Sequence, residues 1–169
     1  GLSNVHHLRP DLRRIARMDP EGLLYQNHPD RCCRLRKTAP LDRALTDYDA
    51  WITGRKRFHG ESRAALPSIE AVDGRVKINP LAGWDRERIQ KTFKKRRLPT
   101  HPLVERGYPS IGCAVCTQPC SSGESLRAGR WRGQAKTECG IHLPRPSAQI
   151  IPLRIPSPVL GSAVLENDH

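Results

Sequence analysis

The chain has 169 residues, and its 29 lysines and arginines against 17 aspartates and glutamates leave a formal net charge of +12 at pH 7. This length suits one ordinary domain, and an aromatic content of only 5% predicts a modest hydrophobic core. The sequence has no apolar run of the roughly 18 residues that a membrane span needs. The first twenty residues lack the apolar block of a secretory signal peptide, so we expect a cytoplasmic protein.

The positive charge predicts an anionic partner, and its densest cluster is formed by Lys91, Lys94, Lys95, Arg96 and Arg97. Such a run is most often the solvated face of a helix. Nucleic acid is not favoured as a partner, because Phe93 is the one aromatic residue within the cluster that could stack on a base. A membrane surface is not expected either, since no broad apolar face accompanies the basic one.

The first half of the chain predicts short helices and one strand. A helix is expected near Leu12–Met18, and a second one starts at Pro29, where proline suits the first turn. The second helix carries RCCRLRK and should end before Pro40, because the residue before a proline avoids helical dihedral angles. A further helix is expected over residues 40–46. The apolar segment over residues 50–54 then predicts a short buried strand.

The second half begins with a hairpin over residues 69–78, because Asp73-Gly74 between apolar flanks is a type I′ turn signal. Asp85 is the expected N-cap of a basic helix that stops at Pro99. Residues 107–123 are rich in Gly, Pro, Cys and Ser and predict a loop suited to a metal or a substrate.

Six cysteines carry most of the chemical information: Cys32, Cys33, Cys113, Cys116, Cys120 and Cys139. Without a secretory signal, metal or redox use is favoured over disulfides. Adjacent cysteines on a helix point about 100° apart, so both can meet one centre only if that centre is large. The CC pair with the CxxC motif therefore suggests a tetrathiolate iron–sulfur cluster. A zinc site, or two unrelated groups of thiols, are the alternatives.

Cys139 stands apart from the other cysteines, in the segment KTECGIH. Lys136 and His142 are close in sequence, and a cationic setting raises the thiolate fraction of a cysteine. Gly140 leaves the backbone free to move. These features are typical of a nucleophile. Cys120 has no evident partner and is interpreted as a spare loop thiol.

The motifs WITGRKR, DGRVKINPLAGW, LPTHPL, GYPSIGCAVCTQP, RAGRWRG and KTECGIH follow one another in this order after DPEGLLYQNHPDRCCRLRKTAPLDRAL. Together they resemble the assimilatory adenylyl-sulfate (APS) and phosphoadenylyl-sulfate (PAPS) reductases over about residues 1–142. The resemblance implies an α/β fold, namely the C-terminal part of an adenine-nucleotide alpha-hydrolase-like, PP-loop-related parallel-sheet fold. A cluster-binding loop and a flexible, Pro-rich tail over residues 143–169 would complete the chain.

The resemblance also implies the chemistry. A cysteine pair with a CxxC motif marks the iron–sulfur branch of the family, which typically reduces APS. Cys32, Cys33, Cys113 and Cys116 would hold a [4Fe–4S] cluster. The matching nucleophile is Cys139, which would attack the sulfur of the sulfate group, release AMP and keep an S-sulfocysteine. Thioredoxin or a similar thiol donor would then release sulfite.

The resemblance further implies a substrate-binding set made of Lys37, Arg57, Arg63, Arg127, Arg130 and His142. Lys37 follows Cys33 by one helical turn, so it can reach both the cluster thiolates and the substrate. Arginine suits a phosphosulfate group because its planar fork binds two anionic oxygens and never deprotonates.

One departure from the family bears on activity. The serine-rich loop that holds the nucleotide phosphate in the family has no counterpart in this sequence, so we expect an N-terminally truncated member. The main alternative to a reductase is therefore a catalytically incompetent iron–sulfur-binding fragment. A basic, nucleic-acid-binding module with four cysteine ligands is the third hypothesis, and it predicts binding that falls steeply with salt. The sequence leaves the oligomeric state open.

Overall fold

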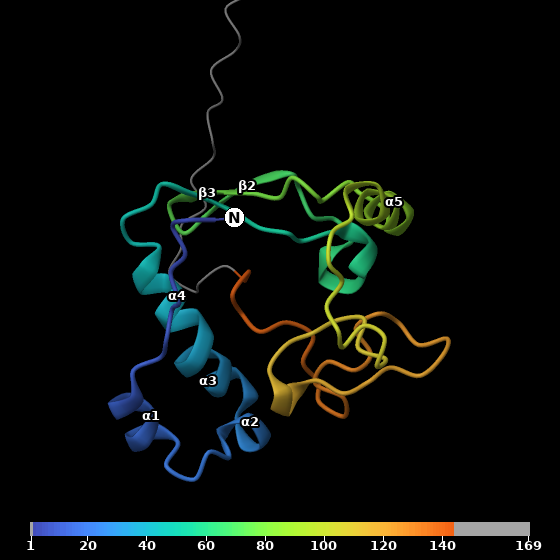
Figure 1. Cartoon of the computed structure of the whole chain (residues 1–169). Helices are drawn as coiled ribbons and strands as arrows, with labels where there is room; N and C mark the ends of the chain where they lie inside the picture. Colours follow the sequence, from blue (N-terminus) through green and yellow to red (C-terminus); the bar gives the residue numbers. More distant parts are fainter. Residues whose placement is uncertain (1, 144–169) are drawn as a thin grey trace, which may run out of the picture.

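A small mixed sheet, a row of short helices and a long irregular region make up residues 2–143, which are the residues that this computed structural model describes (Figure 1). The sheet has the strand order β1-β3-β2. β1 (Ala50–Ile52) runs parallel to β3 (Arg75–Ile78), and β2 (Ile69–Val72) runs antiparallel to β3. The predicted α/β class is confirmed. The predicted tail over residues 143–169 lies outside the described residues, except for residue 143.

The hairpin between β2 and β3 forms as predicted. Asp73 and Gly74 have φ angles of 56° and 73°, the two positive values that a type I′ turn requires. The turn sets the register in which Glu70 faces Lys77 across the strands. Lys77 is only 1% exposed, so the central strand carries a buried cation into the middle of the molecule.

The predicted burial of the strand over residues 50–54 is wrong. Within the described residues β1 is an edge strand that pairs with β3 alone, and Ile52 is 70% exposed. Burial begins just after the strand instead, at Thr53 and Arg55, which form hydrogen bonds with Asn79. An apolar strand is buried only where another element covers it, and local sequence does not supply that information.

Five helical segments precede the sheet: α1 (Leu12–Met18), α2 (Leu24–Asn27), α3 (Pro29–Cys33), the π-helical turn η1 (Arg34–Thr38) and α4 (Ala39–Ala44). The prediction that the cysteine-bearing helix ends before Pro40 is wrong, because α3, η1 and α4 form a continuous run. In η1 the N–H of Ala39 donates to the carbonyl of Arg34, five residues back. This wider turn, with Pro40 in the first turn of α4, lets the chain continue past a residue that lacks an N–H.

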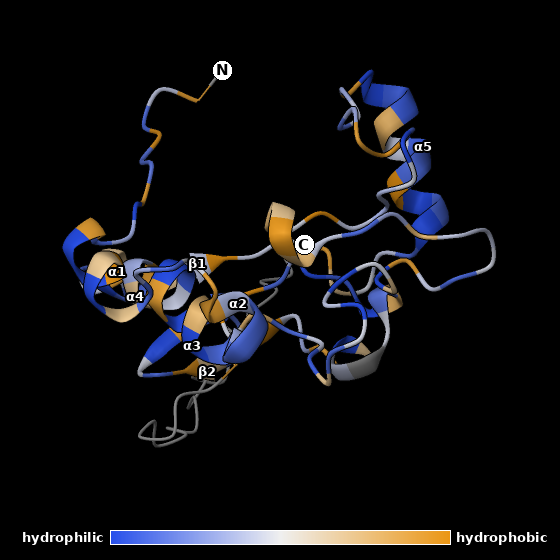
Figure 2. Ribbon diagram, turned by 90° about the horizontal axis from the view of Figure 1, so that it is seen from below, coloured by the Kyte–Doolittle hydropathy of each residue, from blue (hydrophilic) through white to orange (hydrophobic). Residues whose placement is uncertain are grey.

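The basic helix α5 (Arg86–Arg96) also forms as predicted. The side chain of Asp85 accepts a hydrogen bond of 2.7 Å from the N–H of Arg88, and the helix ends at Arg97 in a left-handed conformation. No residue of α5 is buried. Figure 2 shows it as a mostly hydrophilic helix at the edge of the molecule.

The rest of the chain is irregular, apart from the short 3-10 turns η2 (Arg57–His59), η3 (Glu61–Arg63) and η4 (Ala114–Cys116). The predicted loop over residues 107–123 is therefore confirmed. After this loop the chain returns to the middle of the molecule, between the helices and the yellow loop region of Figure 1. Within residues 2–143, no helix has the length and apolar character that crossing a membrane demands.

Candidate active site and cysteine cluster

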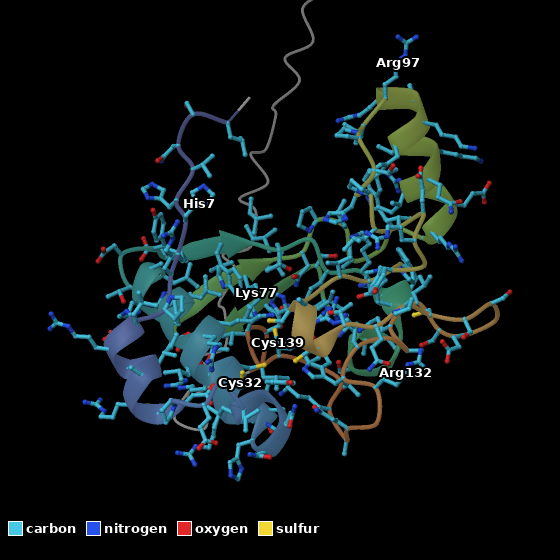
Figure 3. The ribbon with its side chains drawn as sticks, turned by 60° about the horizontal axis from the view of Figure 1, so that its bottom comes forward. His7, Cys32, Lys77, Arg97, Arg132 and Cys139 are labelled. Atoms are coloured by element: carbon cyan, nitrogen blue, oxygen red, sulfur yellow. The ribbon has the colours of Figure 1, made fainter. Side chains whose placement is uncertain are left out.

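Two cysteine pairs that lie 80 residues apart in the sequence come close enough in space for their charges to interact. Cys32 and Cys33 are on α3, Cys113 directly precedes the turn η4, and Cys116 is the last residue of that turn. Burial raises the pKa of the Cys32 and Cys116 thiols, and the charge of Cys113 raises the pKa of both further. Figure 3 shows several sulfur atoms near the labelled Cys32 and Cys139.

The loop that carries Cys113 and Cys116 is fixed by the RAGRW segment. The N–H of Trp131 donates to the carbonyl of Cys116 at 3.0 Å, and the N–H of Gln118 donates to Gly129 at 2.8 Å. Gly129 must be glycine, because a Cβ atom there would lie 2.0 Å from the carbonyl oxygen of Gln118. The second cysteine pair is thus held by a loop 15 residues downstream, which sequence motifs alone do not reveal.

Arg36 and Asp19 are functional candidates that the sequence analysis missed. Arg36 lies within 3.7 Å of the Cys32 sulfur through Nη1, and its Nη2 pairs with Asp19 at 2.6 Å. Asp19 also accepts a hydrogen bond of 2.9 Å from the N–H of Leu24. The Arg36 charge lowers the pKa of Cys32 against the larger effect of burial. The spacing of four residues between Cys32 and Arg36 on one helical run was an available signal.

The four thiols fit a polynuclear iron–sulfur centre as a donor set. Within residues 2–143, no three His, Cys, Asp or Glu side chains are grouped to share one metal ion. The site instead presents four thiols from two segments, the donor number and type that a [4Fe–4S] cluster takes. Burial raises the pKa of Cys33 to about 11, so without a bound cation its side chain is a neutral thiol at pH 7.

Lys37 lies between this thiol cluster and Cys139. Burial by itself lowers the pKa of Lys37, but its hydrogen bond to the Cys113 thiol and the charges of Cys139 and Cys33 raise the pKa above its usual value. An amine held in its charged form next to both groups can offset negative charge at Cys139. Lys37 thus reaches the thiols, as its spacing from Cys33 predicts, while its contact with substrate stays a prediction.

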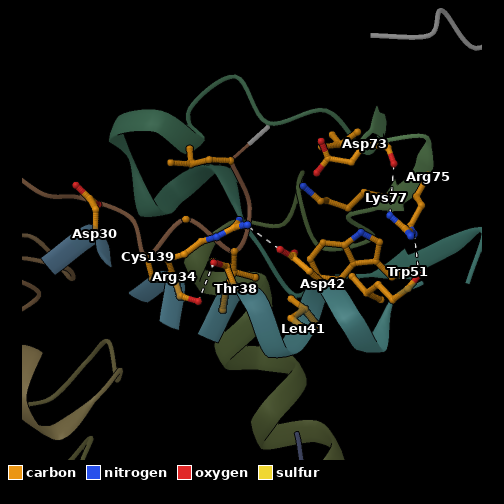
Figure 4. A pocket seen from close by; sticks show the side chains of 15 residues that line it. Asp30, Arg34, Thr38, Leu41, Asp42, Trp51, Asp73, Arg75, Lys77 and Cys139 are labelled. Carbon is orange, nitrogen blue, oxygen red and sulfur yellow. Dashed lines mark hydrogen bonds and ion pairs between the residues drawn. The ribbon is translucent and has the colours of Figure 1, made fainter. Parts of the chain in front are cut away.

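Cys139 lies at a cavity of about 210 Å³ that side chains of α4, β1 and β3 line (Figure 4). Trp51 and Lys77 form part of its wall, and the Lys77 ammonium lies 5.2 Å from the centre of the Trp51 ring. Gly140 has a φ of 86°, a value that other residues rarely adopt, so the chain turns directly after the thiol.

The predicted cationic setting of Cys139 is only partly correct. Lys136 forms an ion pair with Asp30, and its charge acts on Cys33, where it lowers the pKa against the effect of burial. Burial and the charges of Arg55, Lys77 and Arg63 lower the pKa of His142 to about 3, so its ring is neutral at pH 7. The ring stacks on Trp51, with 5.6 Å between centroids.

Two of the four predicted arginines contact the Cys139 segment. Arg63 binds the Glu138 carboxylate with two hydrogen bonds of 2.6 and 2.9 Å. Arg127 donates to the carbonyl of Thr137 at 2.6 Å and lies 3.5 Å from Glu138. Glu138 itself was not predicted as a site residue, although it directly precedes the nucleophile.

The other two predicted arginines support loops. Arg130 donates to the carbonyl of Ile111 at 3.1 Å and packs on the Trp131 ring, so it faces the second cysteine pair. Arg57 donates to the carbonyl of Leu66 at 2.7 Å. Cys120, interpreted above as a spare thiol, accepts a hydrogen bond of 3.2 Å from the N–H of Gly129 and therefore has a structural partner.

Comparison with known proteins agrees with this arrangement. Residues 2–119 match the phosphoadenosine phosphosulfate reductase domain family. A relative from Mesorhizobium japonicum, named adenosine 5'-phosphosulfate reductase, is 50% identical over 85% of this chain and 56% of its own length. Relatives of the same name from Chelativorans sp. and Streptomyces coelicolor are 49% and 43% identical, over 59% and 60% of their lengths. The chain thus spans little more than half the length of these relatives.

A solved structure supports the fold as well. The phosphoadenylyl-sulfate (PAPS) reductase of Candida auris, in a phosphate complex, aligns with a TM-score of 0.50 and 29% identity, covering 67% of this chain and 53% of that protein. Its fold is the adenine-nucleotide alpha-hydrolase-like fold that the sequence analysis anticipates. The sequence match over most of the chain and the structural match together show that the chain belongs to the phosphoadenosine phosphosulfate reductase domain family.

Proposed function

We propose that the chain carries the reductive half of an adenylyl-sulfate (APS) reductase, which converts APS to sulfite and AMP in sulfate assimilation. The observation that carries the proposal is the position of Cys139, next to the Lys37 ammonium and on a segment bound by Arg63 and Arg127. The names of the relatives from M. japonicum and Chelativorans sp. support the choice of substrate.

In the first step the Cys139 thiolate attacks the sulfur atom of the sulfate group. An S–S bond forms, the bond from that sulfur to the bridging phosphate oxygen breaks, and AMP leaves with the electron pair. The nucleophile and the target are both negatively charged, so nearby cations must reduce their repulsion. Lys37 is a cation close enough to interact with Cys139, while Arg63 and Arg127 can bind the anionic oxygens.

In the second step a thiolate of an external dithiol protein such as thioredoxin attacks the Cys139 sulfur. Sulfite leaves, and a mixed disulfide joins Cys139 to the donor. The second donor thiol then breaks this disulfide, which returns the Cys139 thiolate and leaves the donor oxidised by two electrons. Cys139 suits such an exchange because it is half-buried and lines a cavity.

A [4Fe–4S] cluster is part of the proposal, and Cys32, Cys33, Cys113 and Cys116 are the residues that would hold it. When bound, it supplies positive charge to the buried thiolates and joins α3 to the loop around η4. Lys37 then acts on the substrate side, because it donates to Cys113 and faces Cys139 from the same position.

The test is the intact mass of the anaerobically prepared full chain after incubation with APS and no reductant. We expect a single adduct of one SO3 group on Cys139, which a thiol donor removes with the release of sulfite. The Cys139→Ser variant should form no adduct, and Cys120→Ser should form it normally. Iron-containing protein that forms no adduct would favour the alternative of a cluster-binding fragment without activity.

A further inference from the structure

The carboxylate of Glu138 occupies the two arginines that the proposed function assigns to the substrate. Arg63 binds both carboxylate oxygens, at 2.6 and 2.9 Å, and the Arg127 guanidinium lies 3.5 Å away. All three side chains are nearly buried: Arg63 is 13% exposed, Glu138 10% and Arg127 8%. A guanidinium that binds two oxygens side by side is also the usual arrangement for phosphate and sulfate groups. The site therefore already holds an anion, supplied by the chain itself.

The same contacts determine where Cys139 lies. Arg127 holds the carbonyl of Thr137 at 2.6 Å, and Lys77 holds the carbonyl of His142 at 3.3 Å. Between these two attachments the Glu138 carboxylate is held by its ion pairs with Arg63 and Arg127. Release of Glu138 would leave Cys139 on a chain held at its two ends, with Gly140 as the turn.

We propose that Glu138 is a displaceable internal counter-ion, which a phosphosulfate-type oxyanion replaces at Arg63 and Arg127. Two arginine forks cannot hold Glu138 and a second multiply charged anion in full contact, and the anion of higher charge gains more from them. A cavity of about 210 Å³ borders Arg63 and Glu138, so an anion has a place from which to compete. Displacement frees the segment of Cys139 at the moment when the anion is bound.

This inference rests on the proposed function for the identity of the anion, but its test needs neither APS nor turnover. The probe is inorganic phosphate, with chloride at the same ionic strength as the reference. The first readout is the phosphate affinity of the full chain by calorimetry. The second is the rate at which iodoacetamide alkylates Cys139, followed by peptide mass spectrometry.

In the unmodified chain, we expect phosphate to accelerate alkylation of Cys139 and to saturate at the concentration that calorimetry gives. Glu138→Gln removes the competing charge but keeps the shape of the side chain. It should bind phosphate about tenfold more tightly, and its Cys139 should react fast without phosphate. Arg63→Ala should lose the phosphate response.

Glu124→Gln is the matched control, because Glu124 forms a similar two-point contact with Arg132, at 2.7 and 2.7 Å, in an exposed loop. It should change neither readout. If phosphate leaves the alkylation rate of the unmodified chain unchanged, or Glu138→Gln binds phosphate no more tightly, Glu138 is a structural partner only and the inference is wrong. If phosphate accelerates alkylation while APS forms no adduct, the inference stands and the proposed function fails.

Discussion

Two regions of this molecule are rich in basic residues, and they use them in opposite ways. On α5 the lysines and arginines are exposed, and the contacts they make are short-range, such as Lys91 with Glu87 at 2.8 Å and Arg88 on the Trp84 ring at 4.3 Å. Around Cys139 the basic side chains come from distant parts of the chain and point inward. Lys77 is 1% exposed there, and Arg63 and Arg127 share one carboxylate.

The difference shows that charge density along a sequence is a poor guide to a site. The densest basic run lies on α5, yet the residues that surround the nucleophile are single cations separated by tens of residues. A buried cation must have a partner, and it is therefore fixed in position, whereas an exposed lysine remains hydrated and mobile. Fixed charges are the ones that can stabilise a transition state.

The largest effect is expected from Cys139→Ser. A serine hydroxyl is a far weaker nucleophile than a thiolate, so sulfite release from APS should fall by at least about a thousandfold. Anaerobic assay of sulfite with iron content measured in parallel checks this. A variant that keeps a tenth of the activity would remove Cys139 from the role of nucleophile.

The next largest loss of turnover is expected when a half-buried cation near Cys139 is removed, compared with an exposed cation on α5. Lys37→Ala should lower turnover by about a hundredfold to a thousandfold, the usual loss when one preorganised charge is removed from a reacting group. Lys94→Ala on α5 removes the same side chain from the exposed region and should leave turnover unchanged. Equal losses in the two variants would mean that overall charge, and not position, attracts the substrate.

The four converging thiols predict a loss of cofactor. Cys113→Ser should purify with most of its iron and its visible absorption missing, because a hydroxyl is a poor replacement for a thiolate ligand. Cys120→Ser is the control in the same loop, since a serine can still accept the hydrogen bond from Gly129. Iron retained in Cys113→Ser and lost in Cys120→Ser would reverse the assignment.

A smaller effect is expected from acid, which should lower the free energy of unfolding. His142 has a pKa of about 3 in the folded chain against 6.5 in the unfolded chain, and Arg55, Lys77, Arg63 and Glu138 face it. Between these pH values the unfolded state binds the extra proton, so stability is complete above pH 6.5 and is lost as the pH falls. From pH 7.5 to pH 5 the loss should be about 2 kcal/mol.

Denaturant titrations at pH 7.5 and pH 5 measure this loss. His142→Phe keeps a ring on Trp51 but cannot take up a proton, so its stability should depend less on pH over this range. An unchanged dependence in that variant would assign the acid sensitivity to another group, such as His59, whose pKa burial lowers to about 4.

The smallest effect should come from α5. The double variant Lys94→Ala, Lys95→Ala changes two exposed side chains on a helix without buried residues. Its free energy of unfolding should lie within about 0.5 kcal/mol of the unmodified chain. A larger change in either direction would show that α5 has a partner surface and that its basic face is not simply solvated.

Local sequence determined the elements whose signals are local. The Asp73-Gly74 turn, the Asp85 cap and the helix Leu12–Met18 depend on residues within a few positions of one another, and all three form as predicted. The cysteine motifs and the segment around Cys139 likewise identified the family, because short motifs in a fixed order can be read directly from the sequence.

Only the tertiary structure decided which side chains meet. No sequence pattern pairs Glu138 with Arg63, 75 residues away, or joins Arg36 to Asp19. Sequence reasoning also misjudged the burial of β1 and the effect of Pro40, because burial depends on what covers a strand and a π-helical turn can bypass a proline. Contacts between distant residues are fixed by packing and by the pairing of buried charges, which no local pattern encodes.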